Sequence, residues 1–245
     1  MPAIAPILVF QHMPAQHPGY LFDRLRDDGV DHRFLRLDLG EPIPPLDDYG
    51  ALWVLGGAMD AWQEKEHPWL VPEKQAIREA VLVRDLPYFG VCLGHQLLAD
   101  ALGGTVGPAD HPEIGVVPVA MTTEGERHTL LGGLPATANL LQWHLAEVKA
   151  VPADMQVLAR SSACAIHGIS RGERVLGLQS HIEVSLATVK EWLSVDTARN
   201  QIERHLGDGA AITFEADVEK HMTAMNTAAS ELYARLIATV RTASS

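Results

Sequence analysis

The sequence predicts an α/β fold in which a mostly parallel central sheet carries helices on both faces. Apolar segments of strand length alternate with segments of helical spacing in the first part of the chain. Several apolar segments end in Gly or Pro turns, and the chain from residue 186 onward is helical in pattern. This alternation is typical of parallel strands joined by crossover helices.

Strand and helix signals follow one another in order up to the middle of the chain. Four segments are predicted as strands: 7–10, 32–39, 51–55 and 86–91. Two segments between them are predicted as helices: 20–28 and 73–83. The first helix is closed by Gly29 and the second follows Pro72, residues that favour a helix end and a first helical turn.

The pattern changes after residue 103, where short strands are separated by Gly and Pro. The later strands are predicted at 116–121, 140–144, 155–159 and 175–179. Helical spacing then appears at 187–193 and 216–240. Since no repeat, low-complexity stretch or linker is found, we expect one domain over residues 1–245, with a core at about 7–185 and a helical segment at 186–245.

Charge and cysteine content narrow the class of protein. With 19 basic and 31 acidic residues the net charge is −12, so a surface for nucleic acid or anionic membrane is not expected. Cys92 and Cys164 are too few for a disulfide framework or a Cys-rich zinc site. Neither a basic leader nor a run of ~18 apolar residues is present. We therefore expect a cytoplasmic protein with small-molecule or protein partners.

Cys92 is predicted to lie on a tight turn between a strand and a helix. The surrounding sequence is FGVCLGHQLLADALGG, in which an apolar strand stops at Val91 and helical spacing begins at about Gly94. Gly90 and Gly94 flank the cysteine and permit the strained turn of a nucleophile elbow, here with Cys in place of Ser. The helix N-terminus then favours a thiolate, and the N–H of Leu93 is placed to receive an oxyanion.

A buried cysteine without chemistry is the alternative for both thiols, because most cysteines pack as small apolar residues. Cys164 lies in SSACAIHG, which has no turn signal, and is expected to be such a residue. At Cys92 the flanking glycines favour a nucleophile.

Three motifs in chain order resemble the class I glutamine amidotransferases, a family with a Cys-His-Glu triad. GVCLGHQ around Cys92 is similar to the nucleophile segment of the family, LGGAMD at 55–60 to its oxyanion strand, and LQSHIE at 178–183 to its His-x-Glu segment. The resemblance covers about 7–185 and implies a flavodoxin-like fold.

Further segments resemble the stand-alone branch, which is similar to the amidotransferase domain of GMP synthase but has no fused synthetase. These segments are PWL at 68–70, EIG at 113–115 and QWH at 142–144.

The resemblance implies a role for each matching residue. Cys92 is the expected nucleophile, His181 its general base and acid, and Glu183 the group that orients His181. His181 and Glu183 are two apart at a predicted strand end, so both are expected to project from one face. The backbone N–H groups of Gly57 and Leu93 are the expected oxyanion hole.

Substrate-binding residues are also implied by the resemblance. Gly56, Gln96 and the backbone around Trp143 are expected to hold the glutamyl part of the substrate. A lone His before an acidic residue is usually an ordinary strand edge, and a lone Gly-Gly pair is usually an ordinary turn. Here they indicate a catalytic site only because they occur together with the predicted turn at Cys92. No catalytic role is assigned to the other histidines near the motifs, His95, His144 and His167.

Three departures from the family pattern bear on the substrate. Ile182 stands where the family usually has Pro, which relaxes the local backbone constraint and keeps both functional groups. Ser180 stands where an aromatic residue commonly precedes the His, which predicts a more open pocket wall. Leu145 and Ala146 replace the Gly-Asp that usually follows QWH. These departures predict an amide substrate other than plain glutamine.

The predicted function is that of a cysteine-dependent hydrolase that cleaves γ-glutamyl amides or peptides through a γ-glutamyl thioester. One alternative is a glutaminase subunit that delivers ammonia to a separate synthetase. Another is a catalytically idle member that binds a partner, although an idle scaffold needs none of Cys92, His181 and Glu183.

No cofactor and no metal site are expected. The chain has no phosphate-binding G-x-x-x-x-G-K-[ST] motif and no HExxH pattern among its 12 histidines. A separate synthetase or a γ-glutamylating ligase of the same pathway is a candidate partner. A homodimer is left open, since the C-terminal helical segment can pack on the sheet, cover the pocket or form an interface.

Overall fold

The computed structural model of the protein describes residues 5–243. The strands are β1 (Ile7–Gln11), β2 (His32–Arg36), β3 (Ala51–Val54), β4 (Tyr88–Val91), β5 (Thr105–Met121), β6 (Thr137–Ala150), β7 (Gln156–Arg160), β8 (Gly168–Arg171) and β9 (Val175–Leu178). The α-helices are α1 (Gly19–Asp27), α2 (Leu70–Arg78), α3 (Leu93–Ala101), α4 (Thr123–Arg127), α5 (Leu186–Leu193), α6 (Asp196–Leu206) and α7 (Ala210–Ala243). Short helical turns are η1 (Leu37–Leu39), η2 (Leu46–Asp48) and the π-helical η3 (Glu79–Val83).

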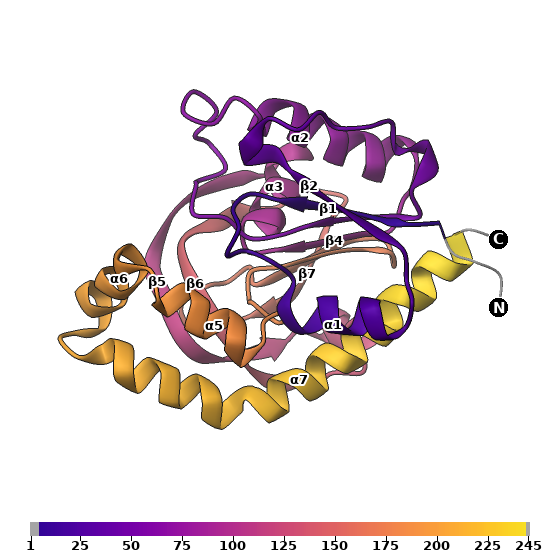
Figure 1. Ribbon diagram of the computed structural model, residues 1–245. Helices are drawn as coiled ribbons and strands as arrows, with labels where there is room; N and C mark the ends of the chain where they lie inside the picture. Colours follow the sequence, from indigo (N-terminus) through magenta and orange to yellow (C-terminus); the bar gives the residue numbers. More distant parts are fainter. Residues whose placement is uncertain (1–4, 244–245) are drawn as a thin grey trace.

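Within residues 5–243 nine strands form one sheet, in the order β2-β1-β3-β4-β9-β8-β7-β5-β6. The strands from β2 to β9 in this order are parallel. Helices α2 and α3 cover one face, while α1 and α7 lie against each other on the opposite face (Figure 1). The predicted α/β fold with a helical C-terminal segment is confirmed.

The other half of the sheet is antiparallel and is built around the β5–β6 pair. Both strands are much longer than the segments predicted at 116–121 and 140–144. The Gly and Pro residues that suggested breaks are accommodated within β5, because the register of the pair shifts between Pro108 and Glu113.

The helical end of the chain differs in detail from the prediction. Helix α7 packs on α1, β5 and β6, so it contributes to the core. Helix α6 lies inside the helical segment expected at 186–245, between the helices predicted at 187–193 and 216–240, and Ile202 is its one buried residue. Among the residues that the structure describes, no helix combines the length and apolarity needed to cross a membrane.

The parallel strands determine where functional groups gather. Because β1, β3, β4 and β9 run in the same direction, the loops that follow them meet at one edge of the sheet. The N–H of Cys92, after β4, donates to the carbonyl of Leu178 at the end of β9 at 2.8 Å.

Candidate active site

Cys92 joins β4 to α3 in a backbone conformation that residues other than glycine rarely adopt. Its φ is 51° and its ψ is −106°. A Cβ on Gly94 would overlap the carbonyl oxygen of Val54, and one on Gly90 would lie 2.6 Å from the carbonyl oxygen of Gly94. Close backbone contacts therefore require both glycines, and they hold the side chain of Cys92 at the edge of the sheet.

His181 and Glu183 are joined by a hydrogen bond in the loop beyond β9. His181 Nδ1 lies 2.8 Å from Glu183 Oε1, and both side chains are buried. Since β9 ends at Leu178, the pairing comes from this loop and not from a shared strand face. An isolated bridge to Leu141 and an edge contact with the Trp192 ring, 4.9 Å between centroids, hold His181 in place.

The imidazole of His181 also interacts with Cys92. Burial alone lowers the pKa of His181, but the charges of Glu183 and Cys92 and hydrogen bonds to both outweigh burial and raise the pKa to about 10. A Cβ on Gly56 would lie 3.1 Å from His181 Cε1 and 3.6 Å from Cys92 Cβ. The structure thus brings the cysteine, the histidine and the glutamate together in a triad-like arrangement, with Gly56 beside them.

Gly57 and Leu93 lie next to each other beside the sulfur. A Cβ on Gly57 would be 2.7 Å from Leu93 Cδ2. Within residues 5–243 neither backbone N–H donates a hydrogen bond to another protein group. Free N–H groups at a helix start and at a glycine turn are able to stabilise a negative oxygen that forms next to Cys92.

His12 and Glu73 lie behind this turn and are not found by sequence reasoning. His12 Nδ1 is 2.8 Å from the carbonyl oxygen of Gly56, and Nε2 is 2.9 Å from Glu73 Oε1. The Trp69 ring stacks on the imidazole, with 5.4 Å between ring centroids. The available signal is the PWL segment, since it places Trp69 one helical turn before Glu73.

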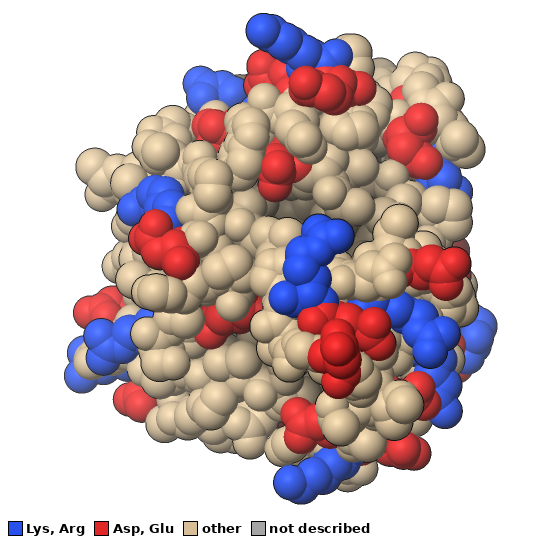
Figure 2. Space-filling model, turned by 90° about the vertical axis from the view of Figure 1, so that its left-hand side faces the viewer, with Lys and Arg blue, Asp and Glu red and all other residues tan. Residues whose placement is uncertain are grey.

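A cavity of about 650 Å³ opens over Cys92 and His181. Its walls come from the loops after β1 and β3, from β6 and from the helical segment around α5 and α6. Figure 2 shows the face that carries α6 and the loop after β3, where a hollow is bordered mostly by uncharged side chains. The large apolar side chains of the lining are Met13, Met59, Trp62, Trp143, Leu145, Trp192 and Val195.

Two charged side chains besides histidine line this cavity within the described part of the chain. They are Asp60 and Arg204, of opposite sign, and neither forms an ion pair within residues 5–243. Burial raises the pKa of Asp60. Ser180, which was expected to open the pocket wall, does not line the cavity, because its hydroxyl is hydrogen-bonded to Gln142 and His167 behind the wall.

Gln96 and Trp143 form part of the cavity wall. Gln96 Nε2 donates to the carbonyl of Ala146 at 3.0 Å and to Gln179 Oε1 at 3.1 Å. The Cys92 sulfur is 3.9 Å from the carbonyl oxygen of Trp143. The backbone of β6 therefore faces the sulfur directly, alongside a fixed Gln96 side chain.

Behind β6 a buried carboxylate joins several strands. Glu113 accepts hydrogen bonds from Ser161 at 2.7 Å and from His167 at 2.7 Å, and lies 3.1 Å from His144 Nε2. Burial alone raises the pKa of Glu113, but these hydrogen bonds outweigh burial and hold the pKa well below its ordinary value. Glu113 thereby links β5, β6 and the β7–β8 loop.

The two histidines connect Glu113 to the cavity wall. His144 Nδ1 is 3.1 Å from the carbonyl of Ala146, which also accepts the hydrogen bond from Gln96 Nε2. His167 Nδ1 is 3.3 Å from the hydroxyl of Ser180, which precedes His181. The EIG and QWH segments carried the signal for this network, although sequence reasoning gave both histidines no role.

The same cluster contains the potential metal ligands of the described residues. Glu113, Cys164 and His167 each place one ligand atom within 4.8 Å of the others. Hydrogen bonds from the protein already occupy both oxygens of Glu113, and burial raises the pKa of Cys164 to about 12, which disfavours a thiolate ligand. The hydrogen-bond network explains the geometry without an ion.

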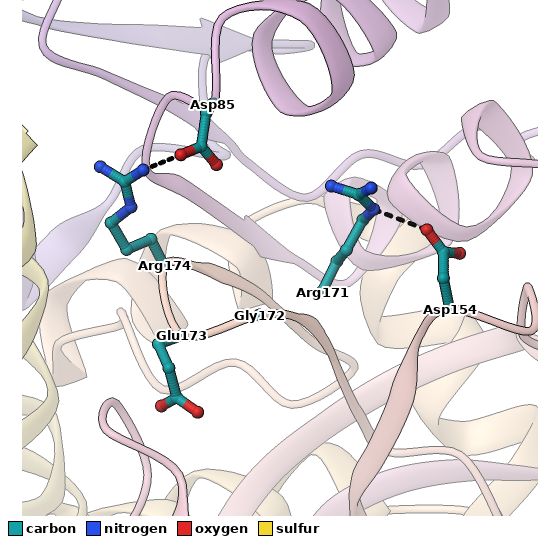
Figure 3. A pocket seen from close by; sticks show the side chains of 6 residues that line it. All are labelled: Asp85, Asp154, Arg171, Gly172, Glu173 and Arg174. Carbon is teal, nitrogen blue, oxygen red and sulfur yellow. Dashed lines mark hydrogen bonds and ion pairs between the residues drawn. The ribbon is translucent and has the colours of Figure 1, made fainter.

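A second hollow lies at the opposite edge of the sheet, around the turn between β8 and β9 (Figure 3). Arg174 pairs with Asp85, and Arg171 Nε lies 2.7 Å from Asp154 Oδ2. Each guanidinium has its own carboxylate partner, and no cysteine, serine or histidine lies among the described residues that line the hollow. This hollow therefore offers no thiol, hydroxyl or imidazole as a nucleophile.

Comparisons with known proteins agree with this geometry. The family model "Glutamine amidotransferase class-I" matches residues 20–197. The glutamine amidotransferase-like protein YfeJ of Salmonella typhimurium is 30% identical over 73% of this chain and 76% of its own length. A glutamine-hydrolyzing GMP synthase subunit of Pyrococcus abyssi is 37% identical over 41% of this chain and 53% of its own length, so the match spans about half of that relative.

Solved structures agree over nearly the whole chain. A glutamine amidotransferase from Thermotoga maritima superimposes with a TM-score of 0.85 at 25% identity, covering 95% of this chain and 98% of that one. A glutamine amido transferase from Methylobacillus flagellatus gives a TM-score of 0.86 at 28% identity, covering 96% and 95%. With the family model, the sequence relatives and the fold in agreement, the chain belongs to the class I glutamine amidotransferases.

Proposed function

We propose that the protein is a cysteine-dependent hydrolase of γ-glutamyl amides, with Cys92 as nucleophile, His181 as general base and acid, and Glu183 as the residue that orients His181. The observation that carries the proposal is the contact of Cys92 with the buried His181–Glu183 pair on the floor of a large, mostly apolar cavity. A raised pKa at His181 keeps an imidazolium beside the sulfur, so that a proton is at hand for the departing amine.

The reaction begins when the Cys92 thiolate attacks the γ-carbonyl carbon. A C–S bond forms, and the carbonyl oxygen becomes an oxyanion that the N–H groups of Gly57 and Leu93 stabilise. When the oxyanion collapses, the C–N bond breaks and His181 gives its proton to the departing amine. His181 then takes a proton from water as the water oxygen attacks the thioester carbon. The C–S bond breaks, glutamate leaves, and the Cys92 thiolate is restored beside the His181 imidazolium.

The cavity supports a leaving group larger than ammonia. Its volume of about 650 Å³ lies within the range of roughly 300–1,000 Å³ typical of pockets for drug-sized ligands. Leu145, one of the departures from the family pattern, lines it together with Trp62 and Val195. Gln96 and the backbone at Trp143 are proposed to hold the glutamyl part, which leaves these apolar side chains for the amine.

A panel of γ-glutamyl amides tests this proposal on the isolated chain. The panel contains glutamine, γ-glutamyl alkylamides, a γ-glutamyl anilide and γ-glutamyl amino acids. We expect an amide with an apolar leaving amine to exceed glutamine in kcat/KM by roughly 10–200-fold, the discrimination that a few apolar contacts supply. Cys92→Ala is the control and is expected to bind substrate without turnover. Glutamine as the best substrate would contradict the proposal.

A glutaminase that serves a separate synthetase is the second candidate, favoured by the similarity to a protein named as a glutamine-hydrolyzing GMP synthase subunit. It predicts that glutamine hydrolysis is slow in the isolated chain and rises sharply when a synthetase partner is added. That result, together with no activity on larger amides, would favour the second candidate over the hydrolase.

A further inference from the structure

The Gly56–Gly57 peptide has a dedicated support that the proposed mechanism does not use. His12 is 1% exposed and Glu73 is 0% exposed, so neither contacts substrate or solvent. His12 Nδ1 lies 2.8 Å from the carbonyl oxygen of Gly56, and Nε2 lies 2.9 Å from a Glu73 carboxyl oxygen. Trp69 covers one face of the imidazole. A buried His–Glu pair thus contacts a single backbone carbonyl, that of Gly56.

Hydrogen-bond chemistry indicates which nitrogen atoms of His12 carry hydrogen. A peptide carbonyl only accepts hydrogen bonds, and so does an ionised carboxylate. His12 Nδ1 therefore carries hydrogen and donates to the Gly56 carbonyl, and the Glu73 carboxyl beside Nε2 favours the imidazolium form of the ring. Burial alone lowers the pKa of His12, but the charge and hydrogen bond of Glu73 outweigh it and raise the pKa, in agreement with this assignment.

Peptide geometry carries the effect of His12 through to the cavity. The chain has no cis peptide bond within residues 5–243, so the N–H of Gly57 points away from the side on which the Gly56 carbonyl lies. His12 is not among the residues that line the cavity, whereas Gly57 lines it and adjoins Leu93. The N–H of Gly57 therefore faces the side of Cys92, where it has no acceptor in the described chain.

We propose that the His12–Glu73 pair presets the oxyanion hole by holding the Gly56–Gly57 peptide in the one orientation that aims the Gly57 N–H at the reacting carbonyl. The inference rests on the proposed function and names His12 as a positioning residue. Two adjacent glycines have no Cβ to restrict rotation of the peptide between them, so an external contact has to supply that restriction. A donor that is fixed in advance needs no reorganisation during the reaction.

Two reactions of Cys92 separate this role from a general loss of structure. Alkylation by iodoacetamide displaces iodide at a saturated carbon and forms no oxyanion. Acylation by p-nitrophenyl acetate passes through an oxyanion but does not need recognition of a glutamyl group. The rates of both are measured on each variant by mass spectrometry of Cys92, and γ-glutamyl amide hydrolysis is measured in parallel. Buried Cys164 is expected to stay unlabelled.

His12→Gln and His12→Asn divide the two hydrogen bonds of the imidazole. The amide nitrogen of Gln takes the place of Nε2 and keeps the contact with Glu73, whereas that of Asn takes the place of Nδ1 and keeps the contact with Gly56. For His12→Gln we expect the acylation rate and the kcat/KM for the amide to fall at least tenfold. The upper limit is the ~10²–10³-fold loss of rate seen when a whole oxyanion donor is removed. The alkylation rate is expected to stay unchanged. His12→Asn is expected to retain most acylation although it leaves Glu73 without a partner and lowers the melting temperature.

His128→Gln is the matched control. His128 is also buried and its Nε2 lies 3.0 Å from a glycine carbonyl, that of Gly172, but this contact is at the opposite edge of the sheet, in the turn shown in Figure 3. Its substitution is expected to change neither rate. If His12→Gln does not fold, His12→Leu, which removes both donors and fills the space, is measured in its place.

The outcomes distinguish the two proposals. The inference would be overturned if His12→Gln had the same ratio of acylation rate to alkylation rate as the wild type, whether both rates stay unchanged or both fall together. A wild type that is acetylated at Cys92 but hydrolyses no γ-glutamyl amide would overturn the proposed function alone, because the ratio of acylation to alkylation still tests His12. A wild type that is not acetylated at Cys92 would overturn both.

Discussion

The two sides of the cavity are held by different kinds of buried charge. On the side of the parallel strands, the His12–Glu73 pair contacts one backbone carbonyl, that of Gly56. On the side of β5 and β6, Glu113 contacts three side chains from two other segments of the chain, β6 and the β7–β8 loop. The first side positions a single N–H next to the sulfur, while the second fixes a whole wall of the pocket.

This difference teaches where sensitivity to mutation is expected. A single contact with one peptide affects the step in which an oxyanion forms and leaves most of the packing unchanged. A carboxylate with several partners contributes to both folding and the shape of the glutamyl site, because its removal leaves several buried donors unsatisfied. His181 lies between the two sides and is proposed to take part in the chemistry itself.

His181→Ala is the change with the largest expected effect and sets the scale for both sides. It removes the proton donor and acceptor, and we expect kcat to fall by about 10²–10⁴-fold, the range for general acid–base catalysis. Glu183→Gln is expected to cost less, since the imidazole remains and only its orientation and charge support weaken. Steady-state kinetics on the best amide of the panel measure both. A larger loss in Glu183→Gln than in His181→Ala would contradict the assigned roles.

Glu113→Gln tests the β5–β6 side and is expected to act on stability and substrate binding together. A carboxamide cannot accept from all the present donors, so the free energy of unfolding should fall by roughly 1–3 kcal/mol. Because His144 holds the Ala146 carbonyl next to Gln96, KM should rise more than kcat falls. Denaturant unfolding and steady-state kinetics measure these effects.

Glu147→Gln is the control for this change. Glu113 and Glu147 are equally buried, each 6% exposed, but the carboxylate of Glu147 accepts from Lys149, and Glu147 is not among the described residues that line the cavity. We expect its KM to be unchanged. A fall in kcat alone in Glu113→Gln would place Glu113 with the chemistry and would remove the contrast between the two sides.

The sequence predicts the side with the parallel strands well, except for its support. Apolar segments and flanking glycines locate the strands and the turn at Cys92, because these features depend on neighbouring residues. His12 lies 44 residues from Gly56 and 61 from Glu73, and only the folded sheet brings them together. A single polar residue after a strand carries no local sign of such a contact.

The opposite side is harder to predict for a related reason. Proline and glycine in β5 indicate breaks, yet the long pairing with β6 overrides this local preference. Helix α6, which contributes Arg204 to the cavity, has one buried residue, Ile202, so its sequence gives little indication of how it packs. Pocket walls that depend on such segments are determined by tertiary contacts, so the identity of the leaving amine is not contained in the motifs.

The smallest expected effect concerns stability against pH in Glu73→Gln. In the wild type the pKa of His12 is raised in the folded state, so its contribution to stability is complete below the unfolded value of about 6.5 and is lost as pH rises through the folded pKa. Without the Glu73 charge, burial should lower the folded pKa of His12, so that the variant becomes less stable as pH falls below about 6.5. The stability difference between the two proteins should therefore grow as pH falls below about 6.5 and should shrink toward pH 9. Urea unfolding at several pH values measures it, and His181, which both proteins share, cancels in the difference. A difference that grows with pH would show that His12 is neutral in the folded wild type, and the two sides of the cavity would then not both depend on buried charge.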